Sequence, residues 1–426
     1  MLDKIVTLLK ESGVHAWELS AVKERGWEFY FIRHELDQHR AKDLEYIQIR
    51  VYQLIEDGKF MGSASADLSP TATEAEAKKL IQDLAYRATL VKNKPYTLNP
   101  PRPGQPMEAP VDVAAIAEDF IRTMAALPET DTEDVNSYEI FVSDKVRRFL
   151  NSEGVDVTER YPDSMIEVVV NARKDGHEIE LYRNFTSGSC DSEALKRDLS
   201  KAMAYGRDRL RTVPTPNLEK ADVLFSGSDA CSIYEYFVDR CDPAMIFRRM
   251  SDWTVGKPVA EELLGDKVSV FARRELPNSS RNQGFDSEGA PIRDCCIIQD
   301  GVVREILGRR MFSCYMGLEN SFHPENIEVT GGTASEEELR KGPYLEAVEF
   351  SDFQVDEMTG DIFGEIRLGY WHDGETVTPV SGGSVSGSMF DFVKDMRMSR
   401  EQAQYDTMRI PALTLLKNVT VTGAEG

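Results

Sequence analysis

The sequence predicts an α+β chain in which strand-and-helix segments are followed by a large β-rich C-terminal domain of sandwich or barrel type. Three observations support this prediction. Before residue 213, strand-like runs rich in aromatic and β-branched residues are interleaved with amphipathic helical stripes. After residue 217, short strand-like runs are separated by Gly, Asp and Asn turns. The length of 426 residues, of which 41% are hydrophobic, suffices for two or three cores.

Two proline clusters divide the chain. Residues 95–110 hold six of the nineteen prolines and are expected to form an extended, exposed connector, and Val213-Pro214-Thr215-Pro216 is a shorter break. The expected parts are an N-terminal α/β domain (1–94), a proline-rich linker (95–110), a middle α+β segment (111–212) and the β-rich C-terminal domain (217–426).

The N-terminal part is expected to begin with a short amphipathic segment and to contain strands near residues 26–33, 46–56 and 60–66. Glu56-Asp57-Gly58-Lys59 joins the last two strands and is typical of a hairpin. Thr73 and Glu76 have the spacing of a capping box. The helix behind them is predicted from one apolar face: Ala77, Leu80, Ile81, Leu84, Ala85 and Ala88.

The middle segment begins with a second amphipathic helix, whose apolar face comprises Val113, Ile116, Ala117, Phe120, Ile121 and Met124. Strand-like runs follow near residues 138–150, 165–171 and 178–184, and a helix is expected near 193–211. In the C-terminal domain, helical patterns occur only near residues 231–237, 247–250 and 389–396, so strands are expected to dominate there.

The charge balance opposes direct nucleic-acid binding. The chain has 73 acidic and 50 basic residues, a formal net charge of −23, whereas nucleic-acid binding requires Lys and Arg to neutralise phosphates. Short basic runs occur at Arg248-Arg249, Arg273-Arg274, Arg309-Arg310 and between Arg207 and Arg211. Because each run is embedded among acids, we interpret these arginines as solvated or ion-paired surface groups.

No membrane or secretory segment is expected. The sequence has no uninterrupted run of about 18 apolar residues and no signal-peptide pattern at its start. Its six cysteines include no C-x-x-C pair, so reduced thiols are expected instead of a disulfide framework or a zinc ribbon. These features predict a cytoplasmic protein without membrane association.

The stretch His34-Glu35-Leu36-Asp37-Gln38-His39 has the composition of a metal site. Two histidines beside a glutamate are typical of helical zinc proteases, in which the glutamate is the general base. However, histidines five residues apart on a helix diverge by about 140°, and strand-like runs flank this polar stretch. We therefore interpret it as a polar strand end and hairpin connection, with a zinc site as the alternative.

The glycine-rich loop from Ser381 to Ser388 fits no catalytic motif. No serine stands between two glycines at the spacing of a nucleophile elbow. Gly382 and Gly387 have the separation found in a P-loop, but Ser388-Met389 stands where Lys-Ser/Thr is needed. The loop is either a tight strand-to-helix connection or a place where backbone N–H groups meet a peptide carboxylate or another anion.

The longest pattern of motifs begins at Gln283-Gly284-Phe285-Asp286-Ser287-Glu288-Gly289-Ala290-Pro291 and continues through 297–303. Later motifs are Asn326-Ile327-x-Val329-x-x-Gly332, the segment 335–339, Thr359-Gly360-Asp361, Gly369, Gly374, Pro379-Val380 and Ser386-Gly387. Earlier motifs are Asp57-Gly58-Lys59 with Gly62-Ser63-Ala64-Ser65, and Asn151-Ser152-Glu153-Gly154. In order and spacing this pattern resembles the TldD/TldE (PmbA) family, known as modulators of DNA gyrase and as metalloproteases, over nearly the whole chain.

The resemblance implies where a zinc site would lie. In TldD-like members, an H-E-x-x-x-H helix follows a strand early in the C-terminal domain, and a cysteine near the C-terminus completes the site. Here the strand is 222–226, Tyr234 and Asp239 stand at the histidine positions, and only Glu235 is retained. No cysteine follows Met398. Since a catalytic zinc needs three protein ligands, the resemblance implies the metal-free TldE branch, with no metal, no cofactor and no catalytic residue.

The resemblance also implies a function. Such a chain would bind a peptide or an unfolded protein segment in a cleft of the C-terminal domain, using strand edges and a few anchors. It would form a homodimer, or a heterodimer with a zinc-bearing TldD-like subunit. The candidate substrate-binding residues are Phe285, Asp286, Glu288, Gly289, Gly382, Gly383, Ser386 and Gly387.

Three alternatives stay open. Residues 285–289 would equally suit a purely structural turn, in which Gly289 supplies backbone freedom and the carboxylates make local hydrogen bonds. The chain would be an active metalloprotease if His34, Glu35 and His39, or a site around Glu235 and Asp239, held a metal. It would be a non-enzymatic regulator if the family's link to DNA gyrase, or a link to toxin–antitoxin control, reflects its role.

Overall fold

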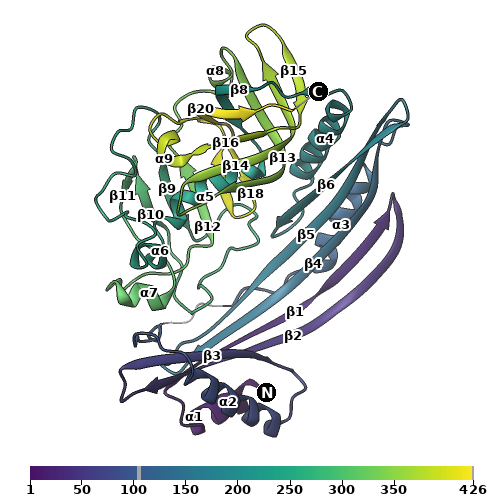
Figure 1. The fold of residues 1–426 in the computed structure, drawn as a ribbon. Coiled ribbons are helices and arrows are strands. Elements are labelled where there is room, and N and C mark those ends of the chain that lie inside the picture. The colour runs from purple at the N-terminus through teal and green to yellow at the C-terminus, as the bar shows by residue number, and fades with distance from the viewer. Residues whose placement is uncertain (103–106, 425–426) are drawn as a thin grey trace.

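The computed structural model describes residues 1–102 and 107–424. A long, curved sheet lies beside a β-rich domain, and helices α1 and α2 lie at one end of that sheet (Figure 1). Helices and strands occur in both halves of the chain, and in the C-terminal half strands are the main regular structure. The predicted α+β class with a β-rich C-terminal domain is confirmed.

The N-terminal half forms one antiparallel sheet of six strands in the order β3-β2-β1-β4-β5-β6. Its strands are β1 (Ala16–Ile32), β2 (Glu35–Ile55), β3 (Phe60–Leu68), β4 (Glu133–Asn151), β5 (Asp156–Lys174) and β6 (His177–Ser187). Its helices are α1 (Leu2–Glu11), α2 (Glu74–Ala88), α3 (Val113–Ala125) and α4 (Ser192–Arg209). Because β1 pairs with both β2 and β4, strands from either side of the proline-rich linker share this sheet.

The strands of this sheet are longer than their apolar patterns predict, since β2 has 21 residues and β4 and β5 have 19 each. Ion pairs between neighbouring strands account for the extra length. Lys42 Nζ lies 3.1 Å from Glu24 Oε1, and Arg25 Nε lies 3.3 Å from Asp43 Oδ2. Such cross-strand ion pairs stabilise strands made of charged residues, so these exposed parts of the sheet do not need alternating apolar and polar residues.

The helices cover one face of the sheet at its two ends. Near β3, α1 and α2 bury Leu19 and Ile49, and at the far end α3 and α4 bury Ile140 and Val168. The predicted capping box is present, because Thr73 accepts from the Glu76 backbone N–H and Glu76 accepts from that of Thr73. Two separate cores therefore stabilise one sheet.

The C-terminal domain contains two sheets around one hydrophobic core. The first has the order β11-β10-β9-β12-β19-β18: β9 (Ser269–Arg273), β10 (Cys295–Gln299), β11 (Val302–Val303), β12 (Asn326–Thr330), β18 (Gln402–Tyr405) and β19 (Met408–Pro411). The second has the order β13-β8-β20-β16-β14-β15-β7, with β17 beside β20: β7 (Val213–Pro214), β8 (Leu218–Phe225), β13 (Tyr344–Val355), β14 (Asp361–His372), β15 (Val377–Ser381), β16 (Ser384–Ser388), β17 (Arg397–Met398) and β20 (Thr414–Thr422).

Short helices connect these strands. They are the 3-10 turn η1 (Ser228–Ala230), α5 (Cys231–Asp239), α6 (Pro243–Phe247), α7 (Arg310–Tyr315), α8 (Glu336–Leu339) and α9 (Met389–Phe392). Of these, α7 and α8 are not predicted from the sequence, because one or two turns give no helical periodicity. Across the described ranges no helix is both long and apolar enough to cross a lipid bilayer. All six cysteines are free thiols, as expected.

The proline-rich linker is not wholly exposed. Leu98 and Asn99 are buried, and Asn99 joins the two halves of the molecule. Its side-chain amide donates to the backbone O of Glu288 at 2.9 Å, and its own backbone O accepts from Asn151 Nδ2 at 2.8 Å. The prediction of an exposed connector is therefore wrong at these two residues, whereas positions 103–106 of that connector lie outside the described residues.

Candidate functional site

Helix α5 follows β8 at the position where the resemblance implies a zinc motif. Tyr234 is completely buried on this helix, and its hydroxyl oxygen lies 2.6 Å from Thr414 Oγ1 on β20. Burial raises the pKa of the Tyr234 phenol, so it remains a neutral group. The tyrosine therefore serves as part of the core and links α5 to β20.

Glu235 and Asp239 lie on the exposed side of the same helix, one turn apart. Partial burial, together with the nearby carboxylates of Glu235, Glu357 and Asp242, raises the pKa of the Asp239 carboxyl to about 6. Partial burial also raises the pKa of Glu235. These shifts arise from lost hydration and from repulsion between like charges, and no cation in the described chain offsets them at Asp239.

The residues at this position do not fit a zinc ion. Positions five apart on a helix diverge by about 140°, and Tyr234 accordingly lies in the core while Asp239 lies at the surface. Zinc would require three convergent donors about 2 Å from the metal. Within residues 1–102 and 107–424, no group of three His, Cys, Asp or Glu side chains is arranged to hold a metal ion.

Substituting Tyr234 tests the structural role of this residue. The change Tyr234→Phe is expected to lower the free energy of unfolding by about 1–3 kcal/mol, because the buried Thr414 hydroxyl would lose its partner. The double variant Tyr234→Phe/Thr414→Val removes both polar groups and should be less destabilised than the sum of the single changes. Urea unfolding of the four proteins gives the coupling energy, and additive losses would contradict a direct hydrogen bond.

The stretch from His34 to His39 forms a hairpin connection, as predicted. Arg33 and His34 make the turn, β2 begins at Glu35, and His39 pairs across the sheet with Phe29. In a strand that rises about 3.3 Å per residue, Glu35 and His39 are separated by roughly 13 Å, too far for one metal ion. His34 instead pairs with Glu129, at 3.0 Å between Nε2 and Oε1.

The candidate residues 285–289 form a joint between the two halves of the molecule. Asp286 is buried, and its Oδ1 accepts from the backbone N–H groups of Glu288 and Ala290, each at 2.9 Å. Its Oδ2 accepts from the His323 backbone N–H at 2.9 Å. Glu288 Oε2 accepts from the Arg310 backbone N–H at 2.7 Å, and burial raises the pKa of the Glu288 carboxyl.

Phe285 and Gly289 pack this turn against the N-terminal sheet. Phe285 joins Phe149, Val155 and Val157 in a small apolar cluster, and the Arg147 guanidinium lies 4.4 Å from the centre of its ring. Gly289 has φ +77°, and a Cβ there would approach the Phe149 ring to 2.7 Å. These contacts are the ones expected of a structural turn, which is the alternative interpretation of residues 285–289 given above.

The other candidate loop lies elsewhere in the C-terminal domain. Gly382 and Gly383 form the turn between β15 and β16, with φ values of +78° and +73°. Ser386 and Gly387 lie on β16, where they pair with β14. The loop is thus a connection between two strands, and helix α9 begins only after Ser388. The loop contacts β14, β20 and α9. Residues 285–289 contact the N-terminal sheet and α7 instead, so the contacts do not bring the two candidate segments together.

Two surface depressions of the C-terminal domain, of about 410 and 380 Å³, are lined by residues that were not predicted. The first lies between β8, α8 and β20 and is lined by Asp222, Thr333, Ala334, Glu338, Leu339, Lys341, Arg397, Leu415 and Lys417. The second is lined by Thr330, Gly331, Gly332, Ser399, Arg400, Gln402 and Arg409. Both sets combine residues far apart in the chain, so no local sequence pattern marks them.

A buried carboxylate also lies near the joint. Glu18 on β1 is only 7% exposed, accepts from Tyr52 Oη at 2.8 Å and lies 3.4 Å from Arg50 Nη1. Burial raises the pKa of Glu18 to about 7, and the carboxylates of Glu288 and Asp286 contribute to this increase. Glu18 stands among the apolar residues of the run 16–19, and this is the sequence feature that could have indicated a buried carboxylate.

Residues 218–423 match the model of the PmbA/TldA metallopeptidase C-terminal domain. A metalloprotease PmbA homolog of Haemophilus influenzae is 23% identical over 210 residues, which cover 47% of this chain and 46% of that relative. The aligned region thus spans less than half of the curated relative.

Solved structures share the fold over almost the whole chain. TldE from Thermococcus kodakarensis superposes with a TM-score of 0.79 and 16% identity, covering 99% of this chain and 100% of that one. Candidate DNA gyrase modulators from Thermotoga maritima and Bacteroides thetaiotaomicron give TM-scores of 0.75 and 0.77, at 17% and 14% identity. Each superposition covers 99% of this chain. It covers 99% of the Thermotoga maritima chain and 98% of the Bacteroides thetaiotaomicron chain. At these identities the structural likeness concerns the fold, whereas the domain match concerns the sequence, and it places residues 218–423 in the family of PmbA/TldA metallopeptidase C-terminal domains.

Proposed function

We propose that this chain is a TldE-like subunit of a TldD/TldE-type peptidase system, which binds peptide segments and has no zinc site of its own. The observation that supports this proposal most directly is the state of helix α5. Tyr234 is committed to the core through Thr414, while Glu235 and Asp239 lie at the surface with raised pKa values. The helix therefore offers no pair of neutral imidazoles and no converging third ligand.

A subunit of this kind would depend on a partner for hydrolysis. The zinc ion and the general base would come from a TldD-like chain, and this chain would contribute peptide binding within a heterodimer. A homodimer is the other assembly we consider. The two depressions of the C-terminal domain have volumes suited to a short stretch of bound peptide. The acidic charge favours a protein–protein role over direct nucleic-acid binding.

Metal analysis tests the absence of a zinc site. Purified protein is expected to contain substoichiometric zinc by mass spectrometry, because the histidines and carboxylates of residues 1–102 and 107–424 do not converge on a metal position. The variant His34→Ala/His39→Ala is expected to have the same metal content as the wild type. Stoichiometric zinc that is lost in this variant would instead support an active metalloprotease with a non-standard site.

Reconstitution tests the peptidase role. A labelled peptide is expected to be cleaved when this chain is mixed with a zinc-bearing TldD-like homologue, and not by this chain alone. The variant Glu235→Gln of this chain should leave cleavage unchanged, whereas replacing the glutamate of the partner's H-E-x-x-x-H motif should abolish it. Loss of cleavage with Glu235→Gln would assign a catalytic role to this chain. No cleavage by any pair would favour a non-enzymatic regulator linked to DNA gyrase or to toxin–antitoxin control.

A further inference from the structure

Basic side chains gather around α6, α7 and the residues that lead into the linker, although the protein as a whole is strongly acidic. The six residues are Lys94, Arg102, Arg248, Arg249, Arg309 and Arg310, and all but Arg310 are exposed. Within the described ranges, no carboxylate oxygen lies within 4.0 Å of the side-chain nitrogens of these six residues. Close ion pairs therefore do not neutralise their positive charge, although Arg309 interacts at longer range with the Glu288 carboxylate.

The other basic runs in the sequence behave differently. Arg273 pairs with Glu328 at 2.7 Å, and Arg274 lies 3.7 Å from Glu275. In the remaining run, Arg207 pairs with Glu133 and Arg211 pairs with Asp208. The interpretation as ion-paired groups thus applies to two of the four runs. The other two, Arg248-Arg249 and Arg309-Arg310, come together in space although sixty residues separate them in the chain.

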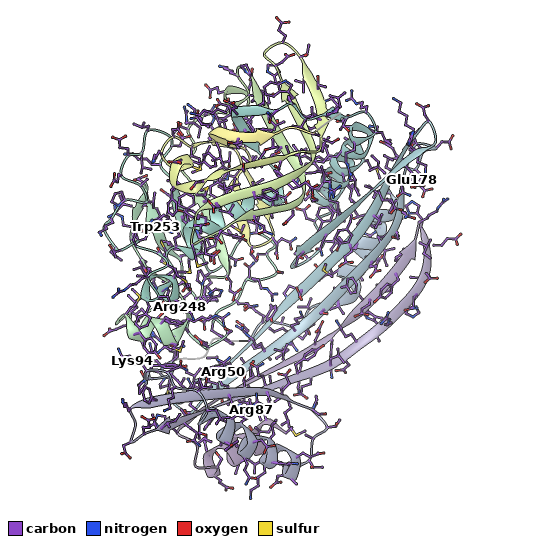
Figure 2. The ribbon with its side chains drawn as sticks, in the orientation of Figure 1. Arg50, Arg87, Lys94, Glu178, Arg248 and Trp253 are labelled. Carbon is purple, nitrogen blue, oxygen red and sulfur yellow. The ribbon has the colours of Figure 1, made fainter. Side chains whose placement is uncertain are left out.

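Aromatic side chains connect Arg248 and Lys94 across this surface. The ring centre of Phe247 lies 5.7 Å from that of Phe312 and 5.2 Å from that of Tyr315. The Arg248 guanidinium lies 4.8 Å from the centre of the Phe312 ring, and Lys94 Nζ lies 5.4 Å from that of Tyr315. Arg248 and Lys94 accordingly lie at the same side of the molecule in Figure 2.

The surface is apolar as well as basic. Phe247 is 46% exposed and Met250 is 39% exposed, so this surface offers apolar contacts beside its charges. Its basic and aromatic composition matches that of interface centres, where Arg, Tyr, Phe and Met are enriched. We name the six basic residues together with Phe247, Met250, Phe312 and Tyr315 the basic aromatic surface.

We propose that the basic aromatic surface binds an acidic polypeptide segment that carries aromatic or aliphatic side chains among its carboxylates. Arginine side chains match carboxylates in geometry, because the planar guanidinium donates two parallel hydrogen bonds. The exposed ring of Phe247 and the half-buried ring of Phe312 offer apolar contacts that a purely acidic segment would not use. This inference is independent of the proposed peptidase role, because it involves neither α5 nor a zinc-bearing partner.

A polypeptide fits this surface better than a nucleic acid does. Single-stranded nucleic acids require a positive groove that follows several phosphates, and the net charge of −23 repels a long polyanion outside the immediate contact. A short acidic segment neutralises the six cations without extending over the acidic remainder of the protein.

Fluorescence anisotropy with a labelled peptide tests this proposal. The probe contains Phe and Leu among Asp and Glu, and a second probe has Lys in place of each acid. We expect the acidic probe to bind the full chain and the lysine probe not to bind. Raising NaCl from about 50 mM to about 300 mM should weaken binding, because the contacts are between exposed charges. Replacing the Phe and Leu of the acidic probe by Ser should also weaken it.

The variants separate this surface from general electrostatic attraction. Arg248→Glu/Arg309→Glu should raise the Kd for the acidic probe roughly tenfold or more. The matched control Lys174→Glu/Lys220→Glu changes the net charge equally at two other exposed lysines without ion pairs, and should leave the Kd unchanged. Phe247→Ser should weaken binding without a change in charge, so it provides a test if the double reversal fails to fold.

Several outcomes would overturn the proposal. Equal losses of affinity for the acidic probe in the two charge-reversed variants would mean that the probe is held by general electrostatic attraction and not by a defined site. A single-stranded oligonucleotide that binds more tightly than the peptide and is displaced by it would assign the surface to nucleic acid. Self-association in sedimentation velocity that is abolished by Arg248→Glu/Arg309→Glu would assign it to a second copy of this chain.

Discussion

Alanine at position 289 is expected to destabilise the protein by about 2–5 kcal/mol, since two costs add at this residue. The backbone of Gly289 has φ +77°, where a Cβ is strained. That Cβ would also approach Phe149 Cδ1 to 2.7 Å and Val155 Cγ1 to 3.0 Å, and both side chains are held in the cluster around Phe285. Neither ring nor valine has free space into which to move.

Gly13 provides the matched control for this substitution. Its φ of +72° is almost the same, but a Cβ there has nothing within 4 Å. Gly13→Ala should therefore cost only about 1 kcal/mol, which is the backbone term alone. Urea unfolding of both variants gives the comparison. Equal losses at the two positions would show that the joint at residues 285–289 yields easily, and would weaken its interpretation as a rigid structural turn.

The second large effect is the pH dependence that Glu18 confers on stability. Burial raises the pKa of Glu18 from an ordinary 4.5 to about 7, so the folded protein holds a proton that the unfolded chain releases. Its contribution to stability is then fully present below about pH 4.5 and is lost as the pH rises through 7. Relative to Glu18→Gln, the wild type should lose up to about 3 kcal/mol of unfolding free energy between pH 4.5 and pH 8.

Glu24, on the same strand, should show the opposite sign. It is equally buried, and although burial alone would raise its pKa, the hydrogen bond from Ser143 and the charges of Lys145 and Lys42 lower it overall. Its contribution is present above the unfolded pKa of 4.5 and is lost at lower pH. Urea unfolding of wild type, Glu18→Gln and Glu24→Gln over this pH range checks both signs. A wild type that gains stability over Glu18→Gln as the pH rises would contradict the assignment.

The parts of the fold that were predicted correctly depend on local signals. The second and third helices have an apolar face, and the capping box at Thr73 and Glu76 fixes where α2 begins. The extra length of β2 was not predicted, because residues such as Lys42 and Asp43 become strand only through partners on β1. Local patterns cannot reveal a partner that lies many residues away.

The candidate sites also divide into features with a local sequence signal and features that depend on contacts between distant residues. The resemblance implies that the zinc motif is missing at residues 234–239, and in the structure Tyr234 is buried there beside Thr414. Residues 285–289 are joined to the linker through contacts of Asn99 with Glu288 and of Arg310 with Thr97, which link positions about two hundred residues apart, so these partners could not be predicted. The basic aromatic surface is a similar case, since Arg248 and Arg309 appear as unrelated pairs in the sequence.

The pairing of β1 with β4 has a consequence for how the chain folds during synthesis. Residues from Glu18 to Ile32 pair with residues from Asn151 to Ser137, so one edge of β1 stays unpaired until the ribosome has released most of the first 151 residues. Closing so long a loop is slow, and an unpaired strand edge is prone to pair with another chain in the meantime. The charged residues along β1 and β2 that lengthen this sheet would also protect the nascent edge from aggregation.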